Sequence, residues 1–260
     1  MGKIVSIHSF RGGTGKSNLT ANIAAQVALA GKRVAIVDTD IQSPGIHVLF
    51  GLNDRTMGHT VNQYLHGECP IVDVAYDIGS AAASDQFPGR SKLTGCQMWL
   101  APSSINGDEI ARVLKDGYDV MQLNRGIMGL LKDLQLDYLF LDTHPGLNQE
   151  TMLSVAISDI LIIILRPDQQ DFQGTAVTVD VARSLDVPEM MLVVNKLLEK
   201  YPPEETRANV EKTYGVPVAA VLPLSEDMAD LGSADLFSLC HPEHKWSRGI
   251  HQIAEKLMAL

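Results

Sequence analysis

A glycine-rich stretch near the start of the chain has the residue types and spacing that suit phosphate binding. It lies between an apolar run at residues 4–7 and a helical pattern at residues 19–29. Glycines allow backbone angles that a Cβ atom resists, so successive N–H groups can converge on phosphate oxygens at the positive end of a helix. The lysine of such a loop reaches the β- and γ-phosphates, and the hydroxyl that follows it can bind Mg²⁺. We predict that the phosphates are bound by Gly12, Gly13, Thr14, Gly15, Lys16, Ser17 and Asn18.

Aspartates stand at the ends of two apolar runs that are typical of buried parallel strands. Asp38 and Asp40 come at the end of the run at residues 33–38, and Asp142 ends the run at residues 137–142. In open α/β sheets ligands gather at the carboxyl ends of the strands, so these carboxylates should lie beside the phosphate loop. The strand-terminal aspartate of phosphate-loop ATPases holds Mg²⁺ through water. We assign that role to Asp142 and expect Ser17 to be the other Mg²⁺-binding residue.

The loop departs from the usual pattern at Phe10, where a glycine is expected. With this departure, Arg11-Gly-Gly-Thr-Gly-Lys-Ser resembles the deviant phosphate loop of the MinD/ParA family of ATPases. In that family a signature lysine occupies the position of Arg11 and crosses the interface of a nucleotide-sandwich dimer to the partner's phosphates. The resemblance therefore implies ATP and Mg²⁺ as cofactors, an ATP-dependent homodimer and a role in trans for Arg11. Arginine keeps the charge of lysine, and its planar fork suits bidentate phosphate contact.

Two further segments resemble the switch regions of the same family. By the first match, Asp40 orients the attacking water or lies in the Mg²⁺ shell, and Asp38 supports it; both could instead cap a turn. The second match is the Asp-Thr-x-Pro-Gly run that begins at Asp142, in which Gly146 lets the backbone rearrange around the γ-phosphate. His144 occupies the variable position of this run. We expect a surface or structural histidine there, and a donor to substrate or partner is the alternative.

The purine pocket is predicted from two residues late in the chain. Asn195 ends the apolar run at residues 190–195, and in the resembled family an asparagine at this place hydrogen-bonds the adenine ring. A strand-end asparagine is also a common turn residue. Pro223 matches the family's proline at the purine pocket. Because the matches cover almost the whole chain, they imply an α/β fold with a doubly wound, mostly parallel sheet and helices on both faces, in a single domain of residues 1–260.

Composition narrows the class of protein. The 260 residues are 45% apolar and 20% charged, which suits one large α/β domain. A formal charge of −10 argues against a protein that binds nucleic acid through a generally basic surface. The three cysteines have no C-x-x-C spacing, so neither an iron–sulfur nor a zinc site is indicated. No signal peptide is expected, and the longest apolar run, residues 160–165, is too short to span a bilayer. We expect a cytoplasmic protein.

Three segments without a clear catalytic role remain. The small-residue loop between Ala81 and Arg90 is expected to be mobile or to bind a partner. His241-Pro-Glu-His244 contains residue types that commonly bind metals, but the proline disfavours helical geometry and we expect a loop. One face of the last helical pattern is apolar, and we expect it to pack on the domain rather than enter a membrane. That face consists of Trp246, Ile250, Ile253 and Leu257.

The sequence thus predicts an Mg²⁺-dependent ATPase switch of the MinD/ParA type, which hydrolyses ATP slowly without a partner protein. Its catalytic residues are Arg11, Lys16 and Asp40, of which the two cations stabilise charge on the transferred phosphoryl group. Nucleoid DNA, a membrane surface or another protein could be what the dimer uses to position or regulate its cargo. The runner-up function is an ATP-dependent ligase or synthase on the same fold that acts on a small molecule.

Overall fold

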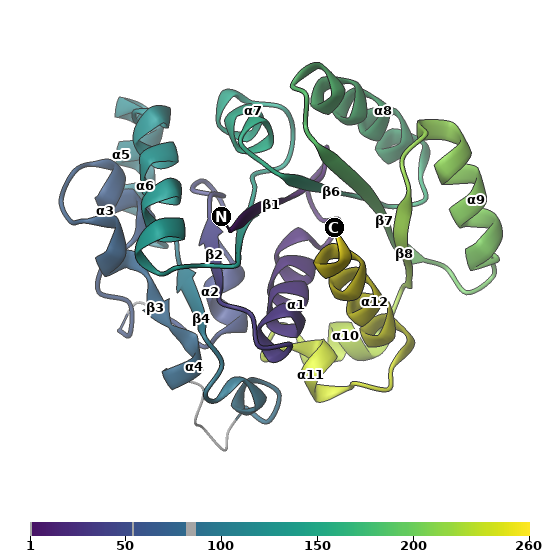
Figure 1. Cartoon of the computed structure of the whole chain (residues 1–260), viewed down its shortest axis with the longest axis horizontal. Coiled ribbons are helices and arrows are strands. Elements are labelled where there is room, and N and C mark those ends of the chain that lie inside the picture. The colour runs from purple at the N-terminus through teal and green to yellow at the C-terminus, as the bar shows by residue number, and fades with distance from the viewer. Residues whose placement is uncertain (1, 54, 82–86) are drawn as a thin grey trace.

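The computed structural model describes residues 2–53, 55–81 and 87–260. The strands of the described residues form one eight-stranded sheet in the order β3-β4-β2-β5-β1-β6-β7-β8 (Figure 1). All neighbouring pairs are parallel except β3 and β4, which are antiparallel. The strands are β1 (Lys3–His8), β2 (Val34–Asp38), β3 (Tyr76–Asp77), β4 (Met98–Ala101), β5 (Tyr138–Asp142), β6 (Ile160–Leu165), β7 (Glu189–Leu197) and β8 (Val218–Pro223).

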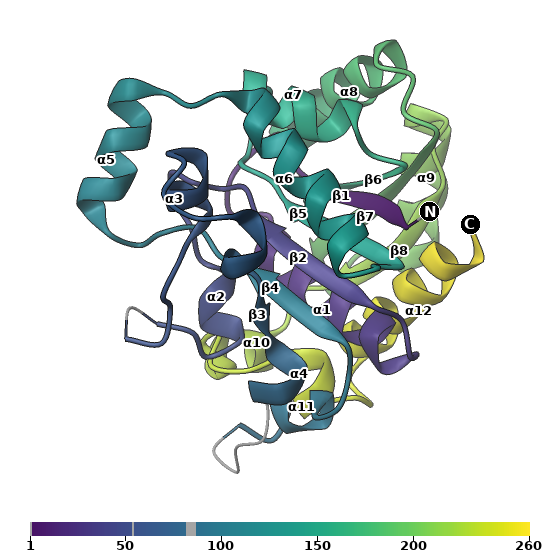
Figure 2. The same cartoon turned by 60° about the vertical axis from the view of Figure 1, so that its left-hand side comes forward.

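Helices cover both faces of this sheet, as expected from its buried, apolar strands. They are α1 (Lys16–Leu29), α2 (Ile46–Leu49), α3 (Val61–Leu65), η1 (Ile71–Val74), α4 (Ile78–Ala81), η2 (Arg90–Leu93), α5 (Gly107–Asp116), α6 (Val120–Asp133), α7 (Gln149–Ala156), α8 (Gln169–Ser184), α9 (Pro203–Tyr214), α10 (Glu226–Leu231), α11 (Phe237–Cys240) and α12 (Lys245–Ala259). Figure 1 shows α1 and α12 on one face and α6, α7, α8 and α9 on the other. The α3 and α5 helices lie side by side at one end of the sheet (Figure 2). The predicted doubly wound, mostly parallel sheet with helices on both faces is confirmed.

The core has a separate layer on each face because successive side chains of a strand point to opposite sides. In β6, which is buried along its whole length, Ile160, Ile162 and Ile164 pack in the layer with α1 and α12. Leu161 and Ile163 pack in the layer with α8 and α9. The strand is therefore covered from both sides, which explains its uninterrupted apolar sequence.

Strand order decides where the polar loops meet. Because β5 lies between β1 and β2 and all three are parallel, their carboxyl ends share one edge of the sheet. Asp38 of β2 and Asp142 of β5 are register partners. The phosphate loop, which follows β1, therefore lies next to both aspartates.

The C-terminal helix packs as expected. Trp246, Ile250, Ile253 and Leu257 of α12 are at most 1% exposed and lie in the layer with α1. Residues 241–244 form a loop between α11 and α12, as predicted. None of the helices that the structure describes is both long enough and apolar enough to cross a bilayer.

The sequence Pro102-Ser-Ser predicts a helix that begins there and is capped by a serine or an asparagine, but α5 begins five residues later, at Gly107. Of the two predicted types of cap, the asparagine is the one found: the Asn106 side chain accepts the N–H of Asp108. The two serines bond elsewhere: Ser103 Oγ donates to the Asp38 carbonyl at 2.8 Å, and the Ser104 N–H donates to Asn62 Oδ1 at 2.9 Å. These bonds hold the segment in an extended conformation at the end of β2, so the helix starts later.

The loop between Ala81 and Arg90 is only partly described, because residues 82–86 lie outside the described ranges. The expectation of a mobile or partner-binding loop falls mainly on those residues and stays a prediction, whereas the C-terminal end of the loop is anchored. The N–H groups of Gly89 and Arg90 donate to the Asp235 carboxylate at 2.8 and 2.9 Å. The Arg90 side chain is 5% exposed and lies 3.7 Å from the same carboxylate.

Candidate nucleotide site

The phosphate loop is held in shape by its own side chains. Thr14 Oγ1 donates to Ser9 Oγ at 2.9 Å, and Ser9 Oγ donates to the Arg11 carbonyl at 2.7 Å. Gly13 and Gly15 have φ values of 76° and 96°, which residues with a Cβ rarely adopt. A Cβ at Gly15 would lie 2.8 Å from Asn195 Nδ2. Backbone conformation therefore favours glycine at both positions, and close contact with Asn195 adds a second reason at Gly15.

A cavity of about 330 Å³ lies at the mouth of this loop. Most residues predicted to bind phosphate line it, and Asp40 joins them. Thr14 does not line it, because its side chain is buried and bonded within the loop. The lining consists of Gly12, Gly13, Gly15, Lys16, Ser17, Asn18, Asp40, Ser43, His144 and Pro145.

Two carboxylates close to this cavity, those of Asp142 and Asp38, are buried. Asp142 is 1% exposed and accepts a hydrogen bond from Thr20 Oγ1 at 3.0 Å. Burial raises its pKa to about 6, although hydrogen bonding from Ser17 and the charge of Lys16 act to lower it. Burial also lowers the pKa of Lys16. The negative charges of Asp142, Asp40 and Asp38 act in the opposite direction and raise it, Asp142 most strongly. The protein therefore keeps opposite charges close together in a poorly solvated site, where each interacts strongly with an added charged ligand.

Asp38 supports Asp40 and does not line the cavity itself. It is fully buried, and its Oδ1 accepts the N–H of Asp40 at 3.0 Å. Burial raises its pKa well above the ordinary value, and the charge of Asp142 adds to this effect. Asp38 Oδ2 is buried without a hydrogen-bond partner among the described residues. Burial at this position therefore disfavours the ionised form of Asp38 relative to an exposed carboxyl group.

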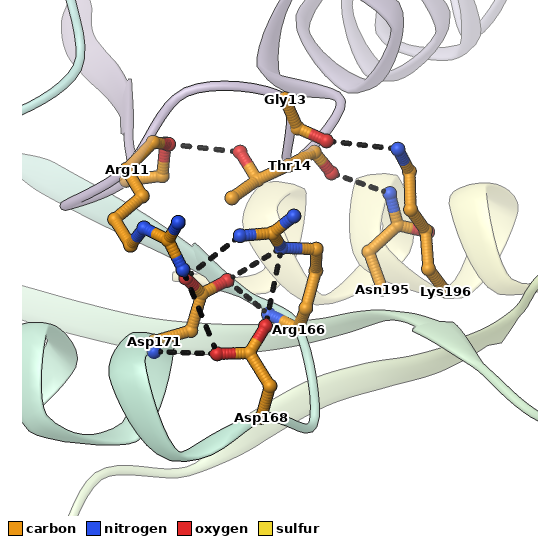
Figure 3. Close-up of polar contacts among 9 residues, drawn as sticks. Arg11, Gly13, Thr14, Arg166, Asp168, Asp171, Asn195 and Lys196 are labelled. Carbon is orange, nitrogen blue, oxygen red and sulfur yellow. Dashed lines mark hydrogen bonds and ion pairs between the residues drawn. The ribbon is translucent and has the colours of Figure 1, made fainter.

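Arg11 does not line its own phosphate cavity. Its side chain reaches toward Asp168 and Asp171 instead (Figure 3). Its guanidinium lies 3.8 Å from Asp168 and 3.7 Å from Asp171, two residues of the β6–α8 junction. Asp171 is buried and also accepts three hydrogen bonds from Arg166, from its backbone N–H at 2.9 Å, Nε at 2.9 Å and Nη2 at 3.1 Å. Arg11 is itself 41% exposed, so its contact with this acidic pair is open to solvent. The structure does not bring Arg11 together with Lys16 and Asp40.

A second cavity, of about 230 Å³, adjoins the loop on the side of β7 and α12. Asn195 and Pro223, the residues predicted at the purine, both line it. Asn195 Nδ2 donates to the Thr14 carbonyl at 2.8 Å, and its Oδ1 accepts from Trp246 Nε1 at 3.4 Å. The asparagine therefore ties the phosphate loop to the C-terminal helix. Figure 3 shows its bond to Thr14. The lining consists of Gly15, Asn18, Leu19, Asn195, Lys196, Pro223, Leu224, Ser225, Met228, Ala229 and Trp246.

Comparison with known proteins agrees with this geometry. The sequence pattern of the AAA domain family matches residues 2–187. The chain belongs to this family.

The resemblance to MinD and ParA proteins is also confirmed. An uncharacterized ATP-binding protein of Methanocaldococcus jannaschii is 22% identical over 255 residues, which cover 98% of this chain and 87% of that protein. The septum site-determining protein MinD of Synechocystis is 26% identical, over 86% of this chain and 76% of that protein. The structure of the septum site-determining protein MinD of Pyrococcus horikoshii, complexed with Mg-ADP, matches with a TM-score of 0.79 at 21% identity, covering 99% and 96% of the two chains.

The site of this MinD/ParA-type chain offers oxygen ligands that fit Mg²⁺. Ser17 supplies a hydroxyl, and Asp142 supplies a carboxylate to which Ser17 is hydrogen-bonded. Within the described residues, no group of three or more His, Cys, Asp and Glu side chains could hold a metal ion alone. Mg²⁺ commonly takes one or two protein oxygens and completes its shell with water and phosphate oxygens. The donor set therefore fits this ion when a nucleotide supplies the other ligands.

Three residues of the site were missed as functional candidates. His144, expected to be structural or on the surface, lines the phosphate cavity and contacts Asp40. Lys196 lines the second cavity, and its Nζ donates to the Gly13 carbonyl at 2.8 Å. Trp246, predicted only to be a core residue, contacts Asn195. For His144, the available signal was its position in the second switch-like segment, two residues after Asp142.

Proposed function

We propose that the chain is an Mg²⁺-dependent ATPase that works as a molecular switch, binding ATP as a homodimer and rearranging after hydrolysis. One observation carries the proposal: the phosphate loop and both switch-like segments line a single cavity, contributing Lys16, Asp40 and His144. A neighbouring cavity at Asn195 has room for a planar base. Triphosphate binding and hydrolysis are the chemistry that this combination serves.

Each residue has a defined part in the proposed reaction. Loop N–H groups and Lys16 hold the phosphates, and Asp40 places the water. The water oxygen bonds to the γ-phosphorus while the bond to the bridging oxygen breaks; ADP keeps the electron pair, and the water's proton goes to the phosphate product. Ser17 and Asp142 hold Mg²⁺, which neutralises charge on the phosphate oxygens. Positioning and electrostatic stabilisation are the main contributions of proteins to this reaction.

Arg11 supplies charge to the partner subunit's phosphates in this proposal. Two features support the assignment: Arg11 is outside its own cavity, and its side chain is 41% exposed while its ion pairs among the described residues are those with Asp168 and the buried Asp171. The exposed pair with Asp168 contributes little stability, and Asp171 keeps its hydrogen bonds from Arg166 if Arg11 leaves, so exchange of these carboxylates for phosphate oxygens costs little. The subunits thus depend on each other for a complete site.

We place the switch in the cytoplasm, with a partner protein that stimulates hydrolysis. Free Cys69, Cys96 and Cys240 agree with a reducing compartment. Of the two extended surfaces on which such a dimer could act, nucleoid DNA is disfavoured by the net charge of −10. Membrane insertion is disfavoured by the buried apolar face of α12. A protein is therefore the first partner to seek.

Light scattering with ADP and with ATP, each with Mg²⁺, tests the proposal alongside phosphate release. We expect the dimer mass with ATP only, and loss of that dimer in Arg11→Ala. Arg248→Ala, which removes an exposed arginine of α12, is the matched control and should dimerise normally. A molar mass that is the same with ADP and with ATP would refute the dimer cycle. Phosphate release that requires an added small substrate would favour a ligase or synthase instead.

A further inference from the structure

His144 and Asp40 form a short contact inside the phosphate cavity. His144 Nδ1 lies 2.7 Å from Asp40 Oδ1, and the two side chains are 22% and 14% exposed. Both residues line the cavity that Lys16 also lines. The contact therefore joins the two switch-like segments at the place where the proposed function puts the attacking water.

The backbones that carry this contact are fixed by the sheet. Thr39, next to Asp40, donates from both its N–H and its Oγ1 to the Asp142 carbonyl, at 3.0 and 2.9 Å. Thr143, next to His144, donates from Oγ1 to the Ile7 carbonyl at 2.9 Å. These bonds lie at the ends of adjacent strands. The imidazole and the carboxylate are thus held next to each other by residues anchored at strand ends, and not by two unconstrained loops.

The chemistry of the two groups defines the direction of the hydrogen bond. An ionised carboxylate can only accept, so the proton of this bond belongs to His144 Nδ1. The N–H of Ser43 donates to the same Asp40 oxygen at 3.1 Å. Both side-chain hydrogen bonds of Asp40 found in the described part of the chain therefore end on Oδ1. Oδ2 is the oxygen that they leave for water.

We propose that His144 is a positioning residue for hydrolysis: its Nδ1–H holds Asp40 Oδ1, so that Oδ2 is oriented toward the water that attacks the γ-phosphate. The inference rests on the proposed ATPase function. A carboxylate held by a single backbone donor can still rotate about its terminal torsion, which is broad. A second donor on the same oxygen limits that rotation, and supporting hydrogen bonds of this kind maintain catalytic geometry.

Two variants separate the hydrogen bond from the bulk of the ring. His144→Asn retains an N–H donor at the same number of bonds from the backbone as Nδ1. His144→Leu fills similar space without any donor. We expect kcat for ATP to fall on the order of tenfold or more in His144→Leu, since loss of a hydrogen bond to a charged group has at least this effect. KM and ADP affinity should change less than about twofold, because the contact does not hold the phosphates.

Rescue and coupling give the decisive readouts. His144→Asn should recover most of the lost kcat, and His144→Leu should have no further effect in an Asp40→Ala background. Equal loss of kcat in His144→Leu and His144→Asn, or wild-type kcat in His144→Leu, would overturn the positioning role while leaving the ATPase proposal intact. A wild-type chain that binds ATP but releases no phosphate would overturn both. Melting temperature and ADP binding report whether each variant is folded.

Discussion

Replacement of Asp142 by asparagine should make the protein more stable at neutral pH while impairing Mg²⁺-dependent hydrolysis. Burial raises the pKa of this carboxyl from 3.8 to about 6. At ~1.4 kcal/mol per pKa unit, the ionised group in the folded protein costs about 3 kcal/mol relative to its neutral form. Asparagine is neutral, has nearly the same shape and keeps an oxygen that can accept from Thr20. It therefore removes the cost of the charge without opening a cavity.

The stabilisation should depend on pH in a defined direction. A carboxyl whose folded pKa lies above its unfolded pKa stabilises the protein fully below the unfolded value, and that contribution is lost as pH rises through the folded value. For Asp142 the loss spans the interval from 3.8 to about 6. The advantage of Asp142→Asn should thus be about 1 kcal/mol near pH 4.5 and about 3 kcal/mol near pH 7.5.

Urea unfolding of wild type and variant at both pH values, in EDTA and without nucleotide, measures this difference. We also expect the melting temperature at pH 7.5 to rise by roughly 6–12 °C, at about 2–4 °C per kcal/mol for a chain of this size. Asp133→Asn, an exposed aspartate at the end of α6, is the matched control and should change little. A variant that is less stable than wild type at pH 7.5, or equally shifted at both pH values, would refute the reasoning.

Two further changes test the loop and the second cavity. Gly15→Ala should weaken ATP binding and lower the melting temperature more than Gly31→Ala. Both glycines have positive φ, but of the two only Gly15 has a neighbour, Asn195, that the added Cβ would meet. Equal effects of the two substitutions on stability and binding would contradict the close-contact argument. Trp246→Phe removes the N–H that holds Asn195 Oδ1, and calorimetry should show about 2- to 10-fold weaker ATP binding. The control Trp99→Phe, on β4 away from the cavity, should leave the affinity for ATP unchanged. Unchanged affinity in both variants would exclude a supporting role of Trp246 in ATP binding.

Most of the fold could be predicted because its signals are local in sequence. The apolar runs that became β1, β2, β5 and β6 are buried on both faces, and this pattern indicates parallel strands with helices on both sides. Helix boundaries were less predictable where several residues compete as caps. Before α5, three polar residues could cap the helix, and the choice of Asn106 followed from the bonds that the two serines make to Asp38 and Asn62.

By itself, the sequence determined the phosphate loop and the aspartates at strand ends, because a motif of adjacent residues on a strand–loop–helix unit specifies its own geometry. Only the tertiary structure decided which side chains face each other across the sheet edge. His144 and Asp40 are 104 positions apart, and their 2.7 Å contact depends on β2 and β5 being neighbours. The contacts of Arg11 with Asp171 and of Asn195 with Trp246 depend likewise on packing between distant elements. Periodicity and turn chemistry report which element a residue belongs to, whereas distances between elements follow from strand order and side-chain packing.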